Sequence, residues 1–125
     1  MGNQQLIKAA LNAREHAYAP YSHFAVGAAV LTKDGQVYTG CNIENASYGA
    51  TNCAERTAFF KAVSEGELQF EAIAIVAGPE GSNLMFTAPC GVCRQVLREF
   101  CSDDFQIILG ENEEEYKVVT LKDLL

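Results

Sequence analysis

Three cysteines and one glutamate have spacings that can build a catalytic zinc site. Cys53 is followed two residues later by Glu55, and Cys90 and Cys93 form a Cys-x-x-Cys pair directly after Pro89. Three thiolates fill three of the four positions that zinc usually has in proteins, and a catalytic site leaves the fourth position for water. A carboxylate beside that water can take up and return protons. These residue types therefore predict hydrolytic chemistry.

Each cysteine motif lies where a helix is expected to begin. Apolar spacing predicts one helix over about 54–65, directly after Cys53, and another from about Cys90. Cys90 and Cys93 are three residues apart, so their side chains share one helix face. Helix N-termini stabilise anions and lower the pKa of thiols. A metal held in this way is expected between two helix ends at the edge of a sheet.

Two arginines stand beside the proposed ligands and can adjust the charge of the site. Three thiolates on Zn²⁺ leave a net charge of about −1, whereas zinc-bound water with a pKa near ~7 belongs to sites with neutral ligands. Arg56 and Arg94 are therefore expected to donate hydrogen bonds to the sulfurs. Either arginine is alternatively an ordinary exposed helix residue.

The remaining patterns predict an α/β fold over residues 1–125 as a single domain. The expected order is α-β-β-α-β-α-β-β-α, which favours a three-layer α/β/α sandwich with a five-stranded mixed sheet. Besides the two helices above, the expected elements are a helix over Gln4–Tyr18, strands over 25–31, 36–41, 72–77, 105–109 and 116–119, and a short helix from Leu121.

Charge and composition exclude several classes of partner. The formal net charge is −7, with acidic residues concentrated over 111–115. A negative surface repels a phosphate backbone, so no nucleic acid partner is expected. The sequence has no secretory signal pattern at its start and no apolar run of membrane-spanning length, so no membrane partner is expected.

The cysteine content indicates a reducing compartment. Five cysteines cannot all pair with one another in disulfides, so reduced thiols and a cytoplasmic location are expected. Cys41 and Cys101 lie outside the metal motif. Both are expected to be small buried hydrophobic residues, because free cysteine is usually buried.

Five ordered segments connect the chain to a known family. They are Ala19-Pro20-Tyr21-Ser22 with Phe24, Val26-Gly27-Ala28-Ala29, Gly40-Cys41-Asn42-Ile43-Glu44-Asn45-Ala46, Cys53-Ala54-Glu55-Arg56-Thr57-Ala58 and Pro89-Cys90-Gly91-Val92-Cys93-Arg94-Gln95. The order Cys-x-Glu then Pro-Cys-x-x-Cys resembles a known signature of zinc deaminases acting on cytosine and adenine. Over nearly its whole length the chain resembles the small cytidine deaminases that act on free nucleosides.

The resemblance implies the reaction and the role of the glutamate. Cytidine, and with it 2′-deoxycytidine, is expected to be hydrolysed to uridine and ammonia in pyrimidine salvage. One Zn²⁺ per chain, held by Cys53, Cys90 and Cys93, activates the water that attacks C4 of the cytosine. Glu55 takes the proton of that water, passes it to N3 and then protonates the departing amine.

The resemblance also implies how the nucleoside is bound. Phe24 packs against the pyrimidine, and the backbone N–H of Ala54 meets its carbonyl. Asn42 and Glu44 bind the ribose hydroxyls, and their i, i+2 spacing in extended chain directs both side chains the same way. The residue types alone leave two alternatives, with Phe24 as an ordinary core residue and Asn42 as a turn former.

In the family that the chain resembles, the small enzymes are homotetramers with active sites at subunit interfaces. Ala46 and Tyr48 are therefore expected to reach into the site of a neighbouring subunit. Within the same chemistry, a blasticidin-S-type deaminase is the alternative. The complete Asn42-Ile43-Glu44-Asn45 segment favours cytidine instead.

Two further alternatives differ in class. A polynucleotide deaminase fits less well, because the chain is acidic and a histidine is the commoner first ligand in those enzymes. A non-catalytic zinc or redox module is the other, because Cys-x-x-Cys is also the spacing of thioredoxin-like dithiols. Bound zinc separates the deaminase from a redox dithiol.

Overall fold

Five strands form one mixed sheet with the spatial order β2-β1-β3-β4-β5. The structure is a computed structural model that describes residues 2–124. Strands β3 and β4 run parallel, and the other neighbouring pairs are antiparallel. The strands are β1 (Phe24–Thr32), β2 (Val37–Cys41), β3 (Phe70–Pro79), β4 (Gln106–Gly110) and β5 (Tyr116–Thr120). The expected five-stranded mixed sheet is confirmed.

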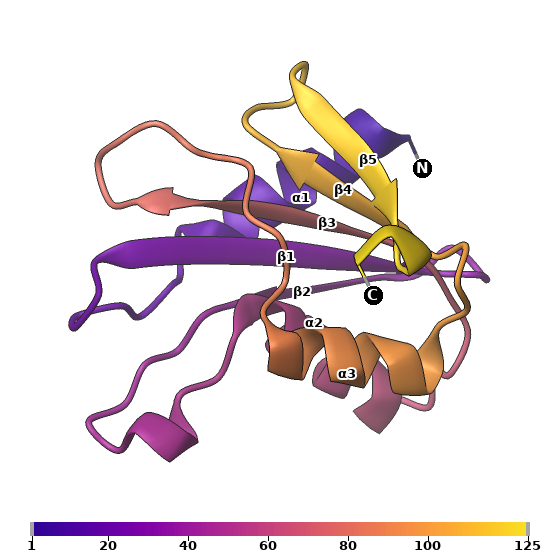
Figure 1. The fold of residues 1–125 in the computed structure, drawn as a ribbon, viewed down its shortest axis with the longest axis horizontal. Helices are drawn as coiled ribbons and strands as arrows, with labels where there is room; N and C mark the ends of the chain where they lie inside the picture. Colours follow the sequence, from indigo (N-terminus) through magenta and orange to yellow (C-terminus); the bar gives the residue numbers. More distant parts are fainter. Residues whose placement is uncertain (1, 125) are drawn as a thin grey trace.

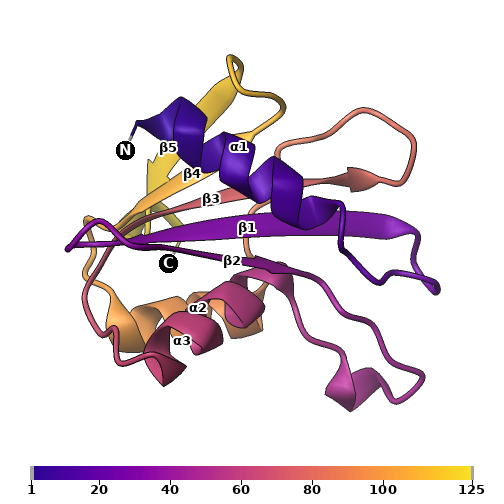
Figure 2. The same ribbon diagram turned by 180° about the vertical axis from the view of Figure 1, so that it is seen from behind.

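Helices cover both faces of the sheet (Figures 1 and 2). Helix α1 (Asn3–Arg14) lies on one face, and α2 (Ala54–Ser64) and α3 (Gly91–Phe100) lie together on the other. Two short 3₁₀ turns, η1 (Tyr48–Ala50) and η2 (Lys122–Leu124), complete the chain. The three-layer α/β/α class is confirmed, and the expected last helix is the η2 turn. None of the helices within residues 2–124 has the length and hydrophobicity needed to cross a membrane.

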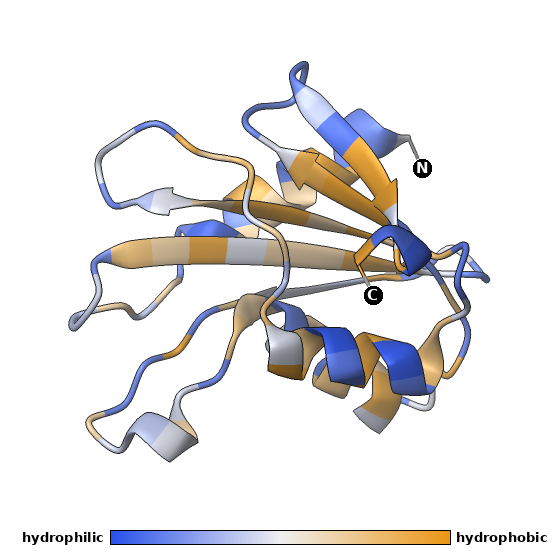
Figure 3. Ribbon diagram, in the orientation of Figure 1, coloured by the Kyte–Doolittle hydropathy of each residue, from blue (hydrophilic) through white to orange (hydrophobic). Residues whose placement is uncertain are grey.

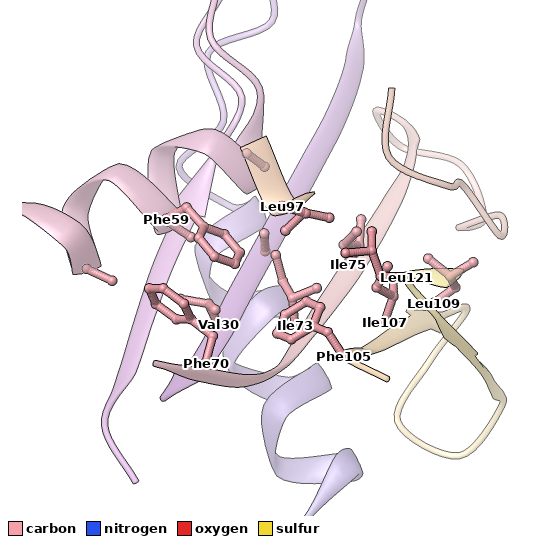
Figure 4. Packing of buried hydrophobic residues seen from close by; sticks show 14 residues of the cluster. Val30, Phe59, Phe70, Ile73, Ile75, Leu97, Phe105, Ile107, Leu109 and Leu121 are labelled. Carbon is pink, nitrogen blue, oxygen red and sulfur yellow. The ribbon is translucent and has the colours of Figure 1, made fainter. Parts of the chain in front are cut away.

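Two apolar clusters, one on each face, join the layers. Successive residues of a strand point to opposite faces, so Ala28 and Val30 pack under α2, whereas Ala29 and Leu31 pack under α1. Phe59 of α2 is fully buried in the cluster between the sheet and α2 (Figure 4). Most residues of the central strands are apolar, whereas polar residues are concentrated in the connecting loops (Figure 3). The strands buried on both faces are therefore the near-continuous apolar runs of the sequence.

Two glycines allow the helices to lie very close to the sheet. A Cβ on Gly27 of β1 would lie 2.1 Å from the carbonyl oxygen of Ala10 in α1. A Cβ on Gly40 of β2 would lie 2.6 Å from the carbonyl oxygen of Ala54 in α2. Only glycine fits where backbones approach so closely. Gly40 therefore fixes how near the N-terminus of α2 lies to β2.

The first helix ends earlier than its apolar spacing predicts, at Arg14 and not at Tyr18. The N–H of Tyr18 donates to the carbonyl of Asn42 at 3.0 Å, and the carbonyl of Tyr18 accepts from the N–H of Glu44 at 2.8 Å. These bonds pair residue 18 with the segment after β2 in extended form. Tertiary contacts thus override the local helical pattern.

The two cysteines outside the metal motif are half-buried, so the expectation of full burial was wrong for both. Cys41 ends β2, and Cys101 directly follows α3. Partial burial raises the pKa of Cys41 and raises that of Cys101 to about 12. Both side chains are therefore protonated at neutral pH and suit a structural role.

The loops that lead into α2 and α3 both leave the sheet at the same end. Phe24, at the start of β1, pairs with Pro79 at the end of β3. Cys41, at the end of β2, pairs with Gly27. The loop over 42–53 and the loop over 80–90 therefore both leave from this end. Their helices begin there and run back along the same face (Figure 1).

Candidate active site

The three predicted metal ligands meet where α2 and α3 begin. Cys53 is the N-cap residue of α2, Cys90 is the N-cap residue of α3, and Cys93 lies buried in the first turn of α3. The sulfur atoms of Cys53 and Cys90 are 3.8 Å apart, and all three sulfurs lie within 4.8 Å of one another. Sulfurs bound at about 2.3 Å to a tetrahedral zinc are about 3.8 Å apart. The group therefore fits one zinc ion.

The donor set also fits a catalytic site better than a structural one. Within residues 2–124, no further histidine, cysteine, aspartate or glutamate joins this group of three. Thiolates are ligands that zinc binds well, and three of them leave a fourth position free for water. The expected zinc cofactor is consistent with this arrangement.

Arg56 makes the sulfur contact that the sequence predicts. Its Nη2 atom donates to the sulfur of Cys53 at 3.2 Å. Hydrogen bonds from the Cys93 thiol and from Arg56 lower the pKa of Cys53 to about 5, although burial opposes them. The Cys93 thiol keeps its proton, and its hydrogen bond to Cys53 raises its pKa. Before any metal binds, Cys53 thus becomes a thiolate more readily than Cys93.

Arg94 does not make the predicted contact. Its Nε donates to the carbonyl oxygen of Pro89 at 2.8 Å, and its Nη1 donates to that of Leu124 at 3.0 Å. Neither hydrogen bond reaches a sulfur. The reason is the η2 turn, which brings carbonyl oxygens from the end of the chain to α3. Arg94 therefore holds the segment before Cys90 against residues 122–124.

Glu55 lies in the first turn of α2 and is 7 % exposed. Burial raises the pKa of its carboxyl group to about 6. A buried carboxyl group with a pKa in this range can both accept and donate protons near neutral pH. This is the behaviour that the predicted proton-transfer role needs.

A cavity of about 340 Å³ joins this carboxylate to the predicted substrate residues. Cys53 and Cys90 lie on its wall. The wall also contains six of the other predicted site residues, which are Phe24, Asn42, Glu44, Tyr48, Ala54 and Glu55. Side chains from β1, from the loop after β2 and from α2 therefore face one space. Its size suits a ligand as large as a nucleoside.

Phe24 and Ala54 have surroundings that suit contact with a base. Phe24 is half-buried and belongs to neither apolar cluster, so the alternative of an ordinary core residue does not hold. Ala54 is the first residue of α2. The first N–H groups of a helix have no partner within it, so the Ala54 N–H is available to a carbonyl in the cavity.

Asn42 and Glu44 line the same cavity and are both held by hydrogen bonds. The Asn42 side chain accepts from the N–H of Val26 at 2.9 Å and donates to the carbonyl of Phe24 at 2.8 Å. The Glu44 carboxylate accepts from the backbone N–H groups of Tyr21 and Ser22. Asn42 is thus more than a turn former, because it joins β1 to the segment after β2.

The loop over 42–52 extends away from the sheet (Figure 1). Tyr48, in the η1 turn of this loop, is 90 % exposed and borders the cavity of its own chain. Ala46 does not line this cavity but a neighbouring hollow of about 400 Å³, which also contacts Tyr48. The contribution of these two residues to a neighbouring subunit remains a prediction.

Several residues of the cavity wall were not singled out as site residues from the sequence, among them Ser22, Thr51 and Thr87. Ser22 falls inside the segment Pro20-Tyr21-Ser22-x-Phe24, so its place next to Phe24 was the one available signal. Thr51 and Thr87 lie in loops without a pattern that marks them. Their position follows from the loops that leave the same end of the sheet.

A carboxylate buried beside three clustered thiols, in an α/β/α sandwich, defines a zinc-dependent hydrolase. A family model described as "Cytidine and deoxycytidylate deaminase zinc-binding region" matches residues 1–109. The chain belongs to the cytidine and deoxycytidylate deaminase family.

Named relatives support the assignment over the full chain. The chain is 54 % identical to a cytidine deaminase of Halalkalibacterium halodurans, over 100 % of this chain and 92 % of the relative. It is 50 % identical to a cytidine deaminase of Sporosarcina psychrophila, over 100 % of this chain and 89 % of the relative. A blasticidin-S deaminase of Bacillus cereus is 34 % identical, over 66 % of this chain and 62 % of the relative. The blasticidin-S alternative is therefore not favoured.

A solved structure has the same fold at high similarity. The crystal structure of a cytidine deaminase from Burkholderia pseudomallei superposes with a TM-score of 0.89 at 49 % identity. The match covers 100 % of this chain and 97 % of that one. A cytidine deaminase from Mycobacterium leprae gives a TM-score of 0.83 at 37 % identity, covering 100 % and 98 % of the two chains.

Proposed function

We propose that this protein hydrolyses cytidine, and 2′-deoxycytidine, to uridine or deoxyuridine and ammonia in pyrimidine salvage. One observation carries the proposal: the buried carboxylate of Glu55 and the thiols of Cys53 and Cys90 share a cavity with Asn42 and Glu44. Catalytic and sugar-binding groups are thus within reach of one nucleoside. The names of the full-length relatives support the same substrate.

The reaction replaces the amino group on C4 of cytosine with the oxygen of water. Zinc, when held by Cys53, Cys90 and Cys93, supplies a water of lowered pKa and so a nucleophile at neutral pH. Glu55 accepts the proton of that water and transfers it to N3 of the base. As the C–N bond breaks, Glu55 takes the remaining proton from the oxygen now attached to C4 and transfers it to the departing amine, which leaves as ammonia while the C4 carbonyl forms. A single carboxylate suffices because the two transfers follow one another at one place.

The other residues orient the nucleoside. Phe24 packs against the pyrimidine, and the Ala54 N–H binds its carbonyl oxygen. The Glu44 carboxylate accepts hydrogen bonds from the ribose hydroxyls, and the side-chain amide of Asn42 donates to them. Their side chains are already held in place by the backbone of residues 21–26, so little entropy is lost when the sugar binds.

Ultraviolet absorbance tests the proposed reaction directly, because cytidine and uridine absorb differently. Protein purified without added metal is first assayed for zinc, with about one ion per chain expected. Incubation with cytidine should then give uridine and ammonia in equal amounts. Metal-free protein with a reversible Cys90–Cys93 disulfide and no turnover would instead support the redox dithiol.

The proposed assembly is a homotetramer with its active sites at subunit interfaces. The exposed η1 turn of the loop over 42–52 supports it, because Tyr48 is 90 % exposed in the single chain and aromatic residues are enriched at interfaces. Two inactive variants test it together. If Tyr48→Ala and Glu55→Gln subunits regain activity after mixing and reassembly, intact sites have formed from two chains. Light scattering measures the number of chains.

The proposed location is the cytoplasm. The metal site needs three reduced thiols, and cytoplasmic conditions keep thiols reduced. The five cysteines are all free in the structure, which is consistent with a reducing compartment. Fractionation of cells that express the protein, with enzymatic activity as the marker, tests this location.

A further inference from the structure

The hydroxyl of Ser22 connects the residue proposed to contact the base with the residue proposed to contact the ribose. It donates to Oε2 of Glu44, and it accepts from the backbone N–H of Phe24 at 3.1 Å. Ser22 lines the active-site cavity with both of these residues. Its donor capacity is used by Glu44, since a hydroxyl has a single proton to donate.

The carboxylate of Glu44 is almost fully engaged before any substrate binds. Its Oε1 accepts from the N–H groups of Tyr21 at 3.0 Å and Ser22 at 3.1 Å. A carboxylate has about four acceptor sites, so the bond from the Ser22 hydroxyl leaves one free site, on Oε2. That site is available to one ribose hydroxyl. The three donors also stabilise the ionised form, with the Ser22 hydroxyl as the largest cause of a lowered pKa.

The turn that contains Ser22 has a costly backbone conformation. His23 has a φ of 56°, in the left-handed region that residues other than glycine rarely adopt. Its N–H donates to the carbonyl of Ala19 at 2.9 Å, and its carbonyl accepts from the N–H of Glu80 at 2.8 Å. Such conformations persist only where surrounding contacts impose them. The turn thereby places the Ser22 side chain between Phe24 and Glu44.

We propose that Ser22 is a positioning residue for nucleoside recognition, which holds the Glu44 carboxylate at a fixed place relative to Phe24. The inference rests on the proposed ribose role of Glu44. Ser22 acts through Glu44 on the sugar and does not contact the reacting atoms. Its loss therefore weakens ground-state and transition-state binding alike, which raises KM and leaves kcat unchanged.

The test compares Ser22→Ala, Glu44→Gln and the double variant with cytidine as substrate. Ser22→Ala is expected to raise KM by roughly three- to tenfold with little change in kcat. In the Glu44→Gln background the same change should add less than about twofold, because residues in one hydrogen-bond network are not additive. Ser22→Thr keeps the hydroxyl and should restore a KM close to that of the unaltered protein.

A matched control is available at the opposite end of the sheet. The hydroxyl of Ser102 also donates to a nearby carboxylate, that of Asp104, but outside the cavity. Ser102→Ala should leave both kinetic constants unchanged. Zinc content and the thermal unfolding midpoint of each variant show that the fold and the metal site are intact.

A substrate without the 2′ and 3′ hydroxyls of the ribose separates an effect of Ser22 through Glu44 from a general structural effect. With 2′,3′-dideoxycytidine, Ser22→Ala should leave kcat/KM unaltered, because the contact that Glu44 provides is absent. If Glu44→Gln leaves the KM for cytidine unchanged, the proposed ribose role of Glu44 is wrong. If Glu44→Gln raises KM but Ser22→Ala does not, or if their effects multiply in the double variant, the role of Ser22 is wrong.

Discussion

The sulfur atoms of Cys53 and Cys90 lie 3.8 Å apart although the two residues are 37 positions apart in the sequence. The sheet explains this proximity. Strands β2 and β3 both end on the side of the sheet where β1 begins, so the loops that follow them start close together. Helices α2 and α3 then begin side by side, each with a cysteine as its N-cap residue. The metal site is thus assembled by two strand–loop–helix connections.

Removal of any one of the three thiols should abolish tight zinc binding. Cys93→Ala is the sharpest case, because Cys93 is 1 % exposed and no solvent molecule easily replaces its sulfur. We expect zinc content to fall from about one ion per chain to a small fraction of that, since two ligands hold zinc poorly. Metal analysis after dialysis measures the change, with activity lost in parallel.

Cys101→Ala is the matched control for that experiment. Cys101 is half-buried and lies outside the ligand group. Its substitution should leave zinc content and turnover unchanged. Full zinc in Cys93→Ala, or loss of zinc in Cys101→Ala, would show that the ligands are assigned wrongly.

Arg56 should support zinc binding, whereas Arg94 should not. Arg56→Gln removes the hydrogen bond to the Cys53 sulfur and leaves more negative charge at the site. Loss of such a supporting contact typically costs roughly 10- to 100-fold in metal affinity. Competition with a coloured chelator measures the affinity.

Arg94→Gln provides the comparison. Arg94 contacts the carbonyls of Pro89 and Leu124 and makes no described hydrogen bond to a sulfur. This variant should lower stability against urea while zinc affinity changes much less than in Arg56→Gln. Equal losses of zinc affinity in the two variants would rule out a specific sulfur contact by Arg56.

Alanine substitutions at the two tightly packed glycines should distinguish a loss of stability alone from a loss of stability together with zinc binding. In Gly40→Ala the new Cβ would lie 2.6 Å from both the Ala54 carbonyl oxygen and the Ala58 nitrogen, so α2 must shift. The shift would move Cys53 and Glu55 away from α3. We expect weaker zinc binding and lower kcat, together with a stability loss of about 1–3 kcal/mol, which is typical of overpacking.

Gly27→Ala creates an even closer clash, 2.1 Å from the Ala10 carbonyl oxygen, but on the opposite face. Helix α1 contributes no residue to the cavity wall. This variant should lose at least as much stability in urea unfolding and keep its zinc affinity. If both variants lose stability and zinc affinity in the same proportion, the position of α2 is not set specifically by Gly40.

Local patterns in the sequence predicted the elements that carry their own signals. Apolar runs buried on both faces marked β1 and β3, and the cysteine motifs marked the starts of α2 and α3. The helix expected over Gln4–Tyr18 was too long, because backbone bonds from Tyr18 to distant residues compete with helix formation. Local spacing contains no information about such partners.

The site residues also divide into those that a local pattern marks and those whose contacts depend on distant parts of the chain. Cys53, Glu55, Cys90 and Cys93 are recognisable because their types and spacing are chemically demanding. Arg94 has a suitable type and spacing, but it donates to the carbonyls of Pro89 and Leu124, and only the folded chain brings Leu124 near.

The central claim is that Glu55 moves protons beside a zinc ion held by three other side chains. Zinc content and turnover of Glu55→Gln, measured on the same sample, test it most directly, because glutamine keeps the shape of the side chain but cannot accept the proton. We predict about one zinc per chain, as in the unaltered protein, with kcat for cytidine lower by roughly 10²- to 10⁴-fold. Near-normal turnover by the zinc-loaded variant would contradict the account.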